Sequence, residues 1–186
     1  MSDHRTAGLV LAAGAGTRFG GPKGLARTAD GEPWVERAVR MLTDAGCAPV
    51  LVTVGAAAAE VAALLPGAAI AVPVADWADG LSASVRAGLS AVWGMAADSA
   101  LVVAVDTPDM PAAAARRILA QASSTALAQA VYDGRPGHPV LIGRTHGPAL
   151  AAALSGDRGA GPYLRAHHAV RVECGDLWSG ADVDSR

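Results

Sequence analysis

The stretch LVLAAGAGTRFGGPK, residues 9–23, decides the fold of this 186-residue chain. Its first part continues an apolar run from Ala7 to Ala13, which is short and uninterrupted enough to predict a strand buried on both faces. Its second part is a glycine-rich loop that carries two cations, Arg18 and Lys23. Glycines bring backbone N–H groups close to a bound oxyanion, and the guanidinium and ammonium groups add positive charge. The stretch therefore predicts a polyphosphate-binding loop at the end of a buried strand.

Two common phosphate-binding motifs do not fit this loop. A dinucleotide-binding fingerprint requires a glycine where Phe19 stands, and an acid after the second strand, which closes instead on Val54. A P-loop requires the order Gly-Lys-Ser/Thr, whereas Pro22 precedes Lys23 here. An ordinary glycine-rich turn with incidental basic residues remains the alternative to a nucleotide-binding loop.

The order of strands and helices after this loop predicts an α/β fold. We expect helices at about residues 33–45, 56–65, 81–95, 112–121 and 149–154, and further strands at 50–54, 68–72, 100–105, 126–132, 138–143 and 170–173. Strands separated by helices favour parallel pairing with right-handed crossovers. The expected architecture is a Rossmann-like, mostly parallel sheet with helices on both faces. The strands at 126–132 and 138–143 are expected to pair antiparallel as an edge excursion, and the tail from Ser179 to be loose.

Length and composition narrow the class of protein. At 186 residues the simplest organisation is one domain, residues 1–186. The chain has fifteen basic and seventeen acidic residues, so it lacks the excess positive charge that would attract nucleic acid. No apolar run approaches the roughly 20 residues that a membrane span requires. Cys47 and Cys174 form no metal-binding pattern, which favours free thiols in a cytosolic protein. A cytoplasmic enzyme or binding domain is expected, without a membrane or nucleic-acid partner.

Asp106 is the candidate metal ligand. It follows the apolar run 100–105, and ligands of open α/β sheets gather at the carboxyl ends of the strands. Mg²⁺ prefers hard carboxylate oxygens together with phosphates and water, so a carboxylate at this edge is suited to it. Asp109, in the same loop, is expected to be a turn or cap acid.

Together these motifs resemble those of the MobA/MocA-like nucleotidyltransferases, which attach a nucleotide to molybdopterin. The motifs occur in the family's order: the first loop, DGLSAS at 79–84, DTP at 106–108, GHP at 137–139 and GDRGA at 156–160. One departure is Val74-Ala75, where many relatives have Asn-Pro before the Asp-Trp pair. The resemblance implies the fold of nucleotide-diphospho-sugar transferases.

The resemblance also implies a reaction and a set of site residues. A phosphate of the acceptor attacks the α-phosphorus of an NTP, and pyrophosphate leaves. Arg18, Lys23 and Asp106 are implied as catalytic, with Asp106 holding Mg²⁺. The implied nucleotide-binding residues are Leu11, Ala12, Ala13, Gly14, Gly16, Arg18, Lys23, Gly80, Ser82 and Ser84. His138 and Asp157 are implied on the acceptor side, where His138 is otherwise a turn residue and Asp157 a second metal ligand or a loop cap.

The sequence gives conflicting indications of the base. The first loop reads Leu-Ala-Ala-Gly as in the family's cytidylyltransferases, and a Cβ on Ala13 would take room needed by a purine. Asp106-Thr107-Pro108 instead resembles the guanylyl type. We expect CTP over GTP, molybdopterin as acceptor, and a molybdoenzyme or its chaperone as a protein partner. The alternatives are guanylyl transfer to the same cofactor, transfer to a sugar phosphate or another small phosphorylated acceptor, and a non-catalytic nucleotide- or pterin-binding protein.

Overall fold

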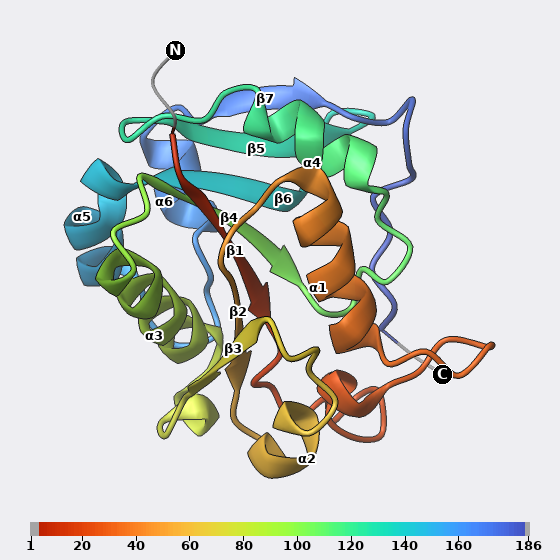
Figure 1. Ribbon diagram of the computed structural model, residues 1–186. Helices are drawn as coiled ribbons and strands as arrows, with labels where there is room; N and C mark the ends of the chain where they lie inside the picture. Colours follow the sequence, from red (N-terminus) through yellow and green to blue (C-terminus); the bar gives the residue numbers. More distant parts are fainter. Residues whose placement is uncertain (1–3, 185–186) are drawn as a thin grey trace.

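A seven-stranded sheet runs through residues 4–184, the part of the chain that the computed structural model describes (Figure 1). Its strands are β1 (Thr6–Leu11), β2 (Val50–Val54), β3 (Ala69–Pro73), β4 (Ser99–Ala104), β5 (Leu127–Tyr132), β6 (Arg135–Gly143) and β7 (Val170–Glu173). Across the sheet they are ordered β3-β2-β1-β4-β6-β5-β7. β1 therefore lies between β2 and β4, and all six of its residues are buried, as the apolar run predicted.

The pairing is parallel among β3, β2, β1 and β4 and between β5 and β7, and antiparallel where β6 meets β4 and β5. The predicted mostly parallel α/β sheet is confirmed, together with the antiparallel β5–β6 pair. The expectation that this pair forms an edge excursion is wrong, because β7 adds to the outer side of β5. Since β1 and β4 are parallel neighbours, the loops that follow them leave the sheet at the same edge.

Helices cover both faces of the sheet (Figure 1). They are α1 (Trp34–Ala45), α2 (Ala58–Ala62), α3 (Leu81–Gly94), α4 (Ala112–Leu119), α5 (Gly147–Ala153) and α6 (Gly161–Ala166), with 3-10 turns η1 (Lys23–Leu25), η2 (Trp77–Asp79) and η3 (Arg144–His146). One apolar core joins α1 and α4 to one face, and a second core joins α3, α5 and α6 to the other. Val10 belongs to the first core and Leu9 and Leu11 to the second, because successive side chains of a strand point to opposite faces.

Two helices differ from the sequence-based expectation. The expected helix over residues 56–65 is shorter, because Ala57 adopts a left-handed conformation with φ 56° and α2 begins only after it. α6 was not expected, although Pro162 in its first turn is a typical helix start. α1, by contrast, ends at Gly46 as expected, because glycine readily adopts the left-handed conformation that terminates a helix. Gly46 has φ 106°, and its N–H donates to the carbonyls of Leu42 and Thr43.

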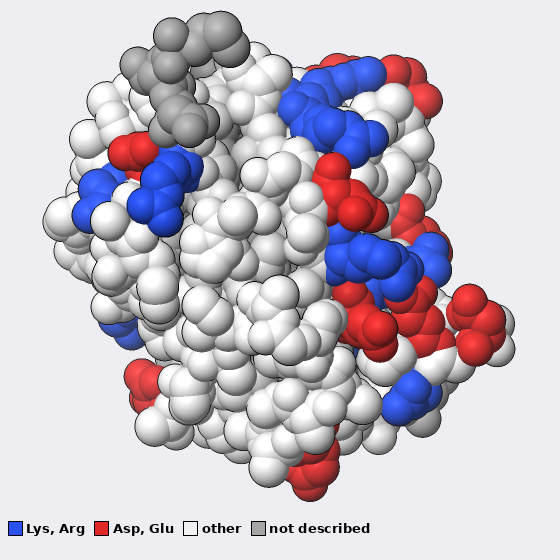
Figure 2. All heavy atoms as spheres, in the orientation of Figure 1, with Lys and Arg blue, Asp and Glu red and all other residues white. Residues whose placement is uncertain are grey.

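Charged side chains gather along the side formed by α1 and α4, whereas the face over β3 and α3 is mostly uncharged (Figure 2). On the charged side, Arg40 of α1 pairs with Glu32, and Arg117 of α4 pairs with Asp176. Within the described part of the chain, none of the helices combines the length and the apolar character that crossing a bilayer requires.

α3 approaches the sheet most tightly at Gly88. A Cβ added there would lie 2.7 and 2.8 Å from the two methyl carbons of Leu9 and 3.0 Å from Cγ2 of Thr53. Leu9 and Thr53 are fully buried, so these neighbours have little room to move. Gly94, at the end of the same helix, offers a contrast, since a Cβ there meets no described atom within 4 Å.

We expect Gly88→Ala to lower the free energy of unfolding by about 1–3 kcal/mol, because the added methyl group overpacks the α3–β1 contact. The matched variant Gly94→Ala should leave stability unchanged or raise it by up to about 1 kcal/mol, since alanine is the better helix former. Urea denaturation of both variants measures the difference. Equal midpoints for the two variants would show that the close approach at Gly88 does not constrain the fold.

Candidate functional site

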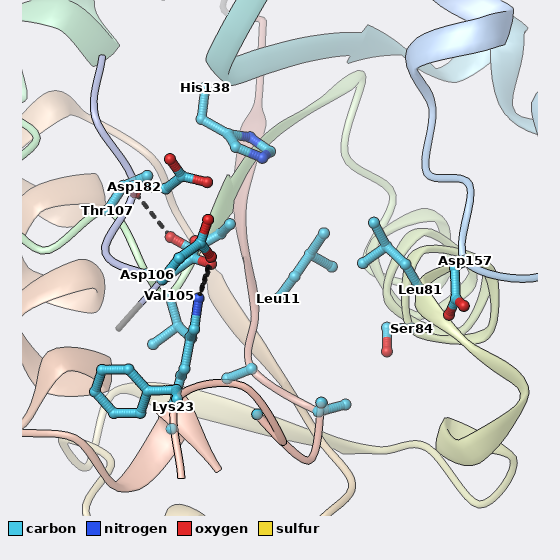
Figure 3. A pocket seen from close by; sticks show the side chains of 18 of the residues that line it. Leu11, Lys23, Leu81, Ser84, Val105, Asp106, Thr107, His138, Asp157 and Asp182 are labelled. Atoms are coloured by element: carbon cyan, nitrogen blue, oxygen red, sulfur yellow. Dashed lines mark hydrogen bonds and ion pairs between the residues drawn. The ribbon is translucent and has the colours of Figure 1, made fainter. Parts of the chain in front are cut away.

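A cleft of about 850 Å³ lies at the carboxyl ends of β1 and β4 (Figure 3). Six segments line it: the loop after β1, η2 with the start of α3, the loop after β4, the β5–β6 hairpin, the loop between α5 and α6, and the C-terminal segment. This is the edge at which the ligands of open α/β sheets bind, and the volume suits a nucleotide-sized ligand.

The loop after β1 folds around the carbonyl group of Gly16. That carbonyl accepts hydrogen bonds from the N–H groups of Phe19, Gly20 and Gly21 at 2.9, 3.0 and 3.1 Å. Gly16 has φ 60°, and a Cβ there would lie 2.0 Å from the carbonyl oxygen of Gly21, so only glycine fits. The tight turn brings the cation Lys23 back to the cleft.

Lys23 lies between two carboxylates. Its Nζ is 2.8 Å from Asp106 Oδ2 and 2.9 Å from Asp184 Oδ1 (Figure 3 shows the Asp106 contact). Burial lowers the pKa of Lys23, but the hydrogen bonds and charges of Asp106 and Asp184 outweigh it, so the pKa lies above its usual value. The ammonium group likewise lowers the pKa of Asp184. The phosphate-loop cation is therefore fully charged and held at the carboxylates.

Three carboxylates form a group at this end of the cleft. Oxygens of Asp106, Asp182 and Asp184 all lie within 4.8 Å of one another. The backbone holds the group together, because the N–H of Val183 donates to the carbonyl of Asp106 at 2.9 Å. Hard oxygen donors of this kind suit Mg²⁺ or Mn²⁺, so this set of side chains fits a divalent cation.

The C-terminal segment differs from the sequence-based expectation, and the place of Asp157 bears on one of its possible roles. The tail from Ser179 was expected to be loose, whereas Gly180, Asp182 and Asp184 line the cleft, and the two carboxylates lie beside Asp106. Asp157, considered as a second metal ligand, lies at the opposite end of the cleft beside Gly80 (Figure 3). The Asp-x-Asp spacing at 182–184 is the sequence signal that could have identified these carboxylates.

His138 of β6 lines the cleft beside this group (Figure 3). Its Nδ1 is 3.3 Å from the carbonyl oxygen of Val102, and the hydroxyl of Tyr132 donates to the His138 carbonyl at 2.6 Å. Burial lowers the pKa of His138, so the ring is neutral at pH 7. Because a carbonyl oxygen only accepts, the proton of the neutral ring belongs on Nδ1, which leaves Nε2 as a hydrogen-bond acceptor.

The other end of the cleft is formed where α3 begins. Gly80, Ser84 and Asp157 line it. Gly80 has φ 106°, and a Cβ there would lie 2.5 Å from Asp157 Oδ1, so this position requires glycine. Ser82 was expected to bind the nucleotide but lies outside the cleft: it is buried, and its N–H donates to the carbonyl of Gly156 at 3.0 Å.

The remaining sequence-predicted residues come together in the cleft. Its lining includes Leu11, Ala12, Ala13, Gly14, Gly16, Arg18, Lys23, Gly80, Ser84, Asp106, His138 and Asp157. Ala13 is 2% exposed and belongs to a small apolar cluster with Val74 and Ala83. The steric argument for a pyrimidine is therefore weakened, because the Ala13 methyl group is largely taken up by packing. Asp182, Asp184, Gln129 and Leu81 are lining residues that the sequence-based prediction missed.

A lysine-bearing glycine loop that faces carboxylates at the carboxyl edge of a mostly parallel sheet brings together groups suited to a phosphate and to a divalent cation. Fold and site together define the chain as a nucleotidyltransferase. The family model described as the MobA-like NTP transferase domain matches residues 8–171, and the chain belongs to this family.

Individual relatives are similar over nearly the whole chain. The protein named nicotine blue oxidoreductase, from Paenarthrobacter nicotinovorans, is 33% identical over 96% of this chain and 91% of its own length. The crystal structure of Rv0371c from Mycobacterium tuberculosis H37Rv superposes with a TM-score of 0.81, at 27% identity, over 99% of this chain and 95% of that one. A structure of Rv0371c in complex with manganese gives a TM-score of 0.73 at 25% identity, over 91% and 88% of the two chains.

The position of Lys23 generates a prediction about metal binding. Since its ammonium already neutralises Asp106 and Asp184, it competes with a divalent cation for them. We expect Lys23→Met to bind Mn²⁺ more tightly than the parent protein when nucleotide is absent. Its affinity for CTP should instead fall by about one to two decades, because a charge-assisted hydrogen bond contributes roughly 1.5–3 kcal/mol.

Electron paramagnetic resonance of free Mn²⁺ and calorimetry with CTP measure the two effects. Arg18→Met is the matched control, since it removes a cation from the same loop but leaves the Lys23 contacts in place. Unchanged or weaker Mn²⁺ binding by Lys23→Met would contradict the competition.

Proposed function

We propose that this chain transfers a nucleotide from an NTP to the phosphate of molybdopterin, with release of pyrophosphate and with CTP as the preferred NTP. The observation that carries the proposal is the contact of Lys23, from the glycine loop, with Asp106 and Asp184 at one end of the cleft. This contact supports the proposal, because the Lys23 ammonium would bind phosphate beside carboxylates that would hold the divalent cation of the nucleotide.

In this proposal, different residues of the cleft have different roles in the reaction. Arg18, Lys23 and the N–H groups of the loop would bind the triphosphate and stabilise the charge that develops on the leaving pyrophosphate. Asp106, Asp182 and Asp184 are the residues that would hold Mg²⁺. When bound, the cation neutralises phosphate oxygens. The chain needs no covalent nucleophile, because alignment and charge neutralisation supply most of the rate in such transfers.

The opposite end of the cleft is suited to the base. The backbone of residues 11–14 and the start of α3 at Gly80 and Ser84 line this region. Support for CTP comes from the resemblance of the first loop to cytidylyltransferases rather than from the Ala13 methyl group. Guanylyl transfer is the closest alternative.

His138 supports an acceptor that carries N–H or O–H groups. Its neutral ring offers a hydrogen-bond acceptor at Nε2 and no positive charge, so it suits the ring of a pterin better than a phosphate. A sugar phosphate also carries donors and remains the second candidate acceptor. We place the reaction in the cytoplasm, which NTP use and the free thiols of Cys47 and Cys174 favour. A molybdoenzyme or its chaperone would then receive the product.

The name of the nicotine blue relative designates oxidation and reduction, which is a different reaction. Hydride transfer has no use for carboxylates beside a phosphate-binding lysine, whereas nucleotidyl transfer can use them to hold the divalent cation of an NTP. The cation site therefore favours nucleotidyl transfer over an oxidoreductase and over a protein that only binds a nucleotide or a pterin.

Asp106→Asn should abolish pyrophosphate release while the protein stays folded, because the amide keeps the shape of the side chain but loses the charge that holds Mg²⁺. A coupled pyrophosphate assay with CTP, Mg²⁺ and molybdopterin measures turnover. Asp109→Asn, in the same loop with its side chain 71% exposed, is the control that should retain activity. Parental turnover by Asp106→Asn at limiting Mg²⁺ would remove Asp106 from the metal site.

The choice of base is tested by competition binding in the presence of Mg²⁺. We expect CTP to displace a fluorescent nucleotide at lower concentration than GTP, since the first loop matches the cytidylyl pattern. GTP binding as tightly as CTP, or more tightly, would overturn the preference for CTP and leave nucleotidyl transfer intact.

A further inference from the structure

The loop that carries Asp106 is tied to α1 by one arginine. Arg37 Nε donates to the carbonyl of Pro108 at 2.5 Å, and Arg37 Nη2 lies 3.4 Å from Asp109 Oδ1. Pro108 is only two residues beyond Asp106. Arg37 therefore holds the loop just after the carboxylate that faces Lys23.

The backbone of the C-terminal segment also holds this loop, through the N–H of Val183 at the Asp106 carbonyl, whereas two further hydrogen bonds of the loop are local. The Thr107 hydroxyl donates to the carbonyl of Ala104 at 2.8 Å, and the N–H of Met110 donates to the carbonyl of Thr107 at 3.2 Å, so both bonds are local. Across residues 4–184, Arg37 is the one side chain from outside the loop that donates a hydrogen bond to the loop's backbone. It connects the helical layer directly to the site.

Arg37 lies in α1 and is itself held in place by an ion pair with Glu32. Its Nη1 lies 3.5 Å from Glu32 Oε2, and the side chain of Glu32 is 17% exposed. The second oxygen of Glu32 pairs with Arg40, one turn further along α1. Because a guanidinium group is planar and presents its donors in a rigid fork, Glu32 and Pro108 together define the orientation of Arg37.

We propose that Arg37 is a positioning residue for the divalent-cation site: by fixing the carbonyl of Pro108, it sets where the Asp106 carboxylate stands. The inference rests on the proposed function, in which Asp106 holds the cation. Arg37 is not among the residues that line the cleft, so its effect passes through the backbone of the loop. Lysine cannot replace it fully, since one ammonium group lacks the fork that reaches Glu32 and Pro108 together.

The test compares Arg37→Gln and Arg37→Lys with the matched control Arg40→Gln, which removes the neighbouring partner of Glu32 without touching the loop. Mn²⁺ binding in the presence of CTP is measured by electron paramagnetic resonance, and pyrophosphate release is measured across a Mg²⁺ titration. We expect Arg37→Gln to weaken Mn²⁺ binding about tenfold, at the low end of the range for residues that support metal ligands. Turnover should fall at low Mg²⁺ and recover as Mg²⁺ rises, with Arg37→Lys intermediate.

A merely structural role would lower the melting temperature of all these variants without changing the Mg²⁺ dependence. Parental metal dependence in Arg37→Gln, or an equal change in Arg40→Gln, would overturn the proposal. Mn²⁺ binding can be measured without turnover, and the Mn²⁺ affinity of Asp106→Asn gives the reference value for a protein that has lost the metal site. Absence of pyrophosphate release by the parent protein would therefore overturn the proposed function while the metal-binding comparison still decides the role of Arg37.

Discussion

The site depends on the ion pair between Lys23 and Asp106. Their contact, at 2.8 Å, joins residues that are 83 positions apart in the chain. It forms because β1 and β4 are parallel neighbours, so that the loops after them leave the sheet at one edge. The two side chains are 16% and 22% exposed, so solvent screens their attraction less than it screens a surface pair. Asp184 joins the same ammonium group and brings the C-terminal segment onto the cleft.

The surrounding scaffold makes this contact possible by close packing. Gly88 lets α3 lie directly on Leu9 of β1, and the start of α3 consequently reaches the cleft at Gly80. On the other face, α1 carries Arg37 to the loop that follows β4. The two helical layers therefore position opposite ends of one cleft, with the buried strand β1 between them.

The placement of polar groups along the cleft separates two kinds of chemistry. One end gathers Lys23 and three carboxylates, which suit phosphates and a divalent cation. The other end offers backbone and small side chains around Gly80 and Ser84. His138, neutral through burial, stands beside the charged end and adds a hydrogen-bond acceptor without adding charge. An NTP has the same division between its triphosphate and its base.

Local sequence patterns were sufficient to predict much of the fold and part of the candidate site. The apolar run before Gly14, the glycine loop with Arg18 and Lys23, and the acid after the fourth strand predicted the parallel sheet and the charged end of the cleft, because burial, turn geometry and strand order are encoded in neighbouring residues. Tertiary structure alone decided the rest. Asp182 and Asp184 reach Asp106 only because the tail folds back across the sheet edge, and Ser82 is buried outside the cleft. The place of β5 inside the sheet, and not at its edge, likewise depends on β7 pairing with it. Contacts between segments so distant in sequence leave no periodic pattern, because they depend on which strands become neighbours.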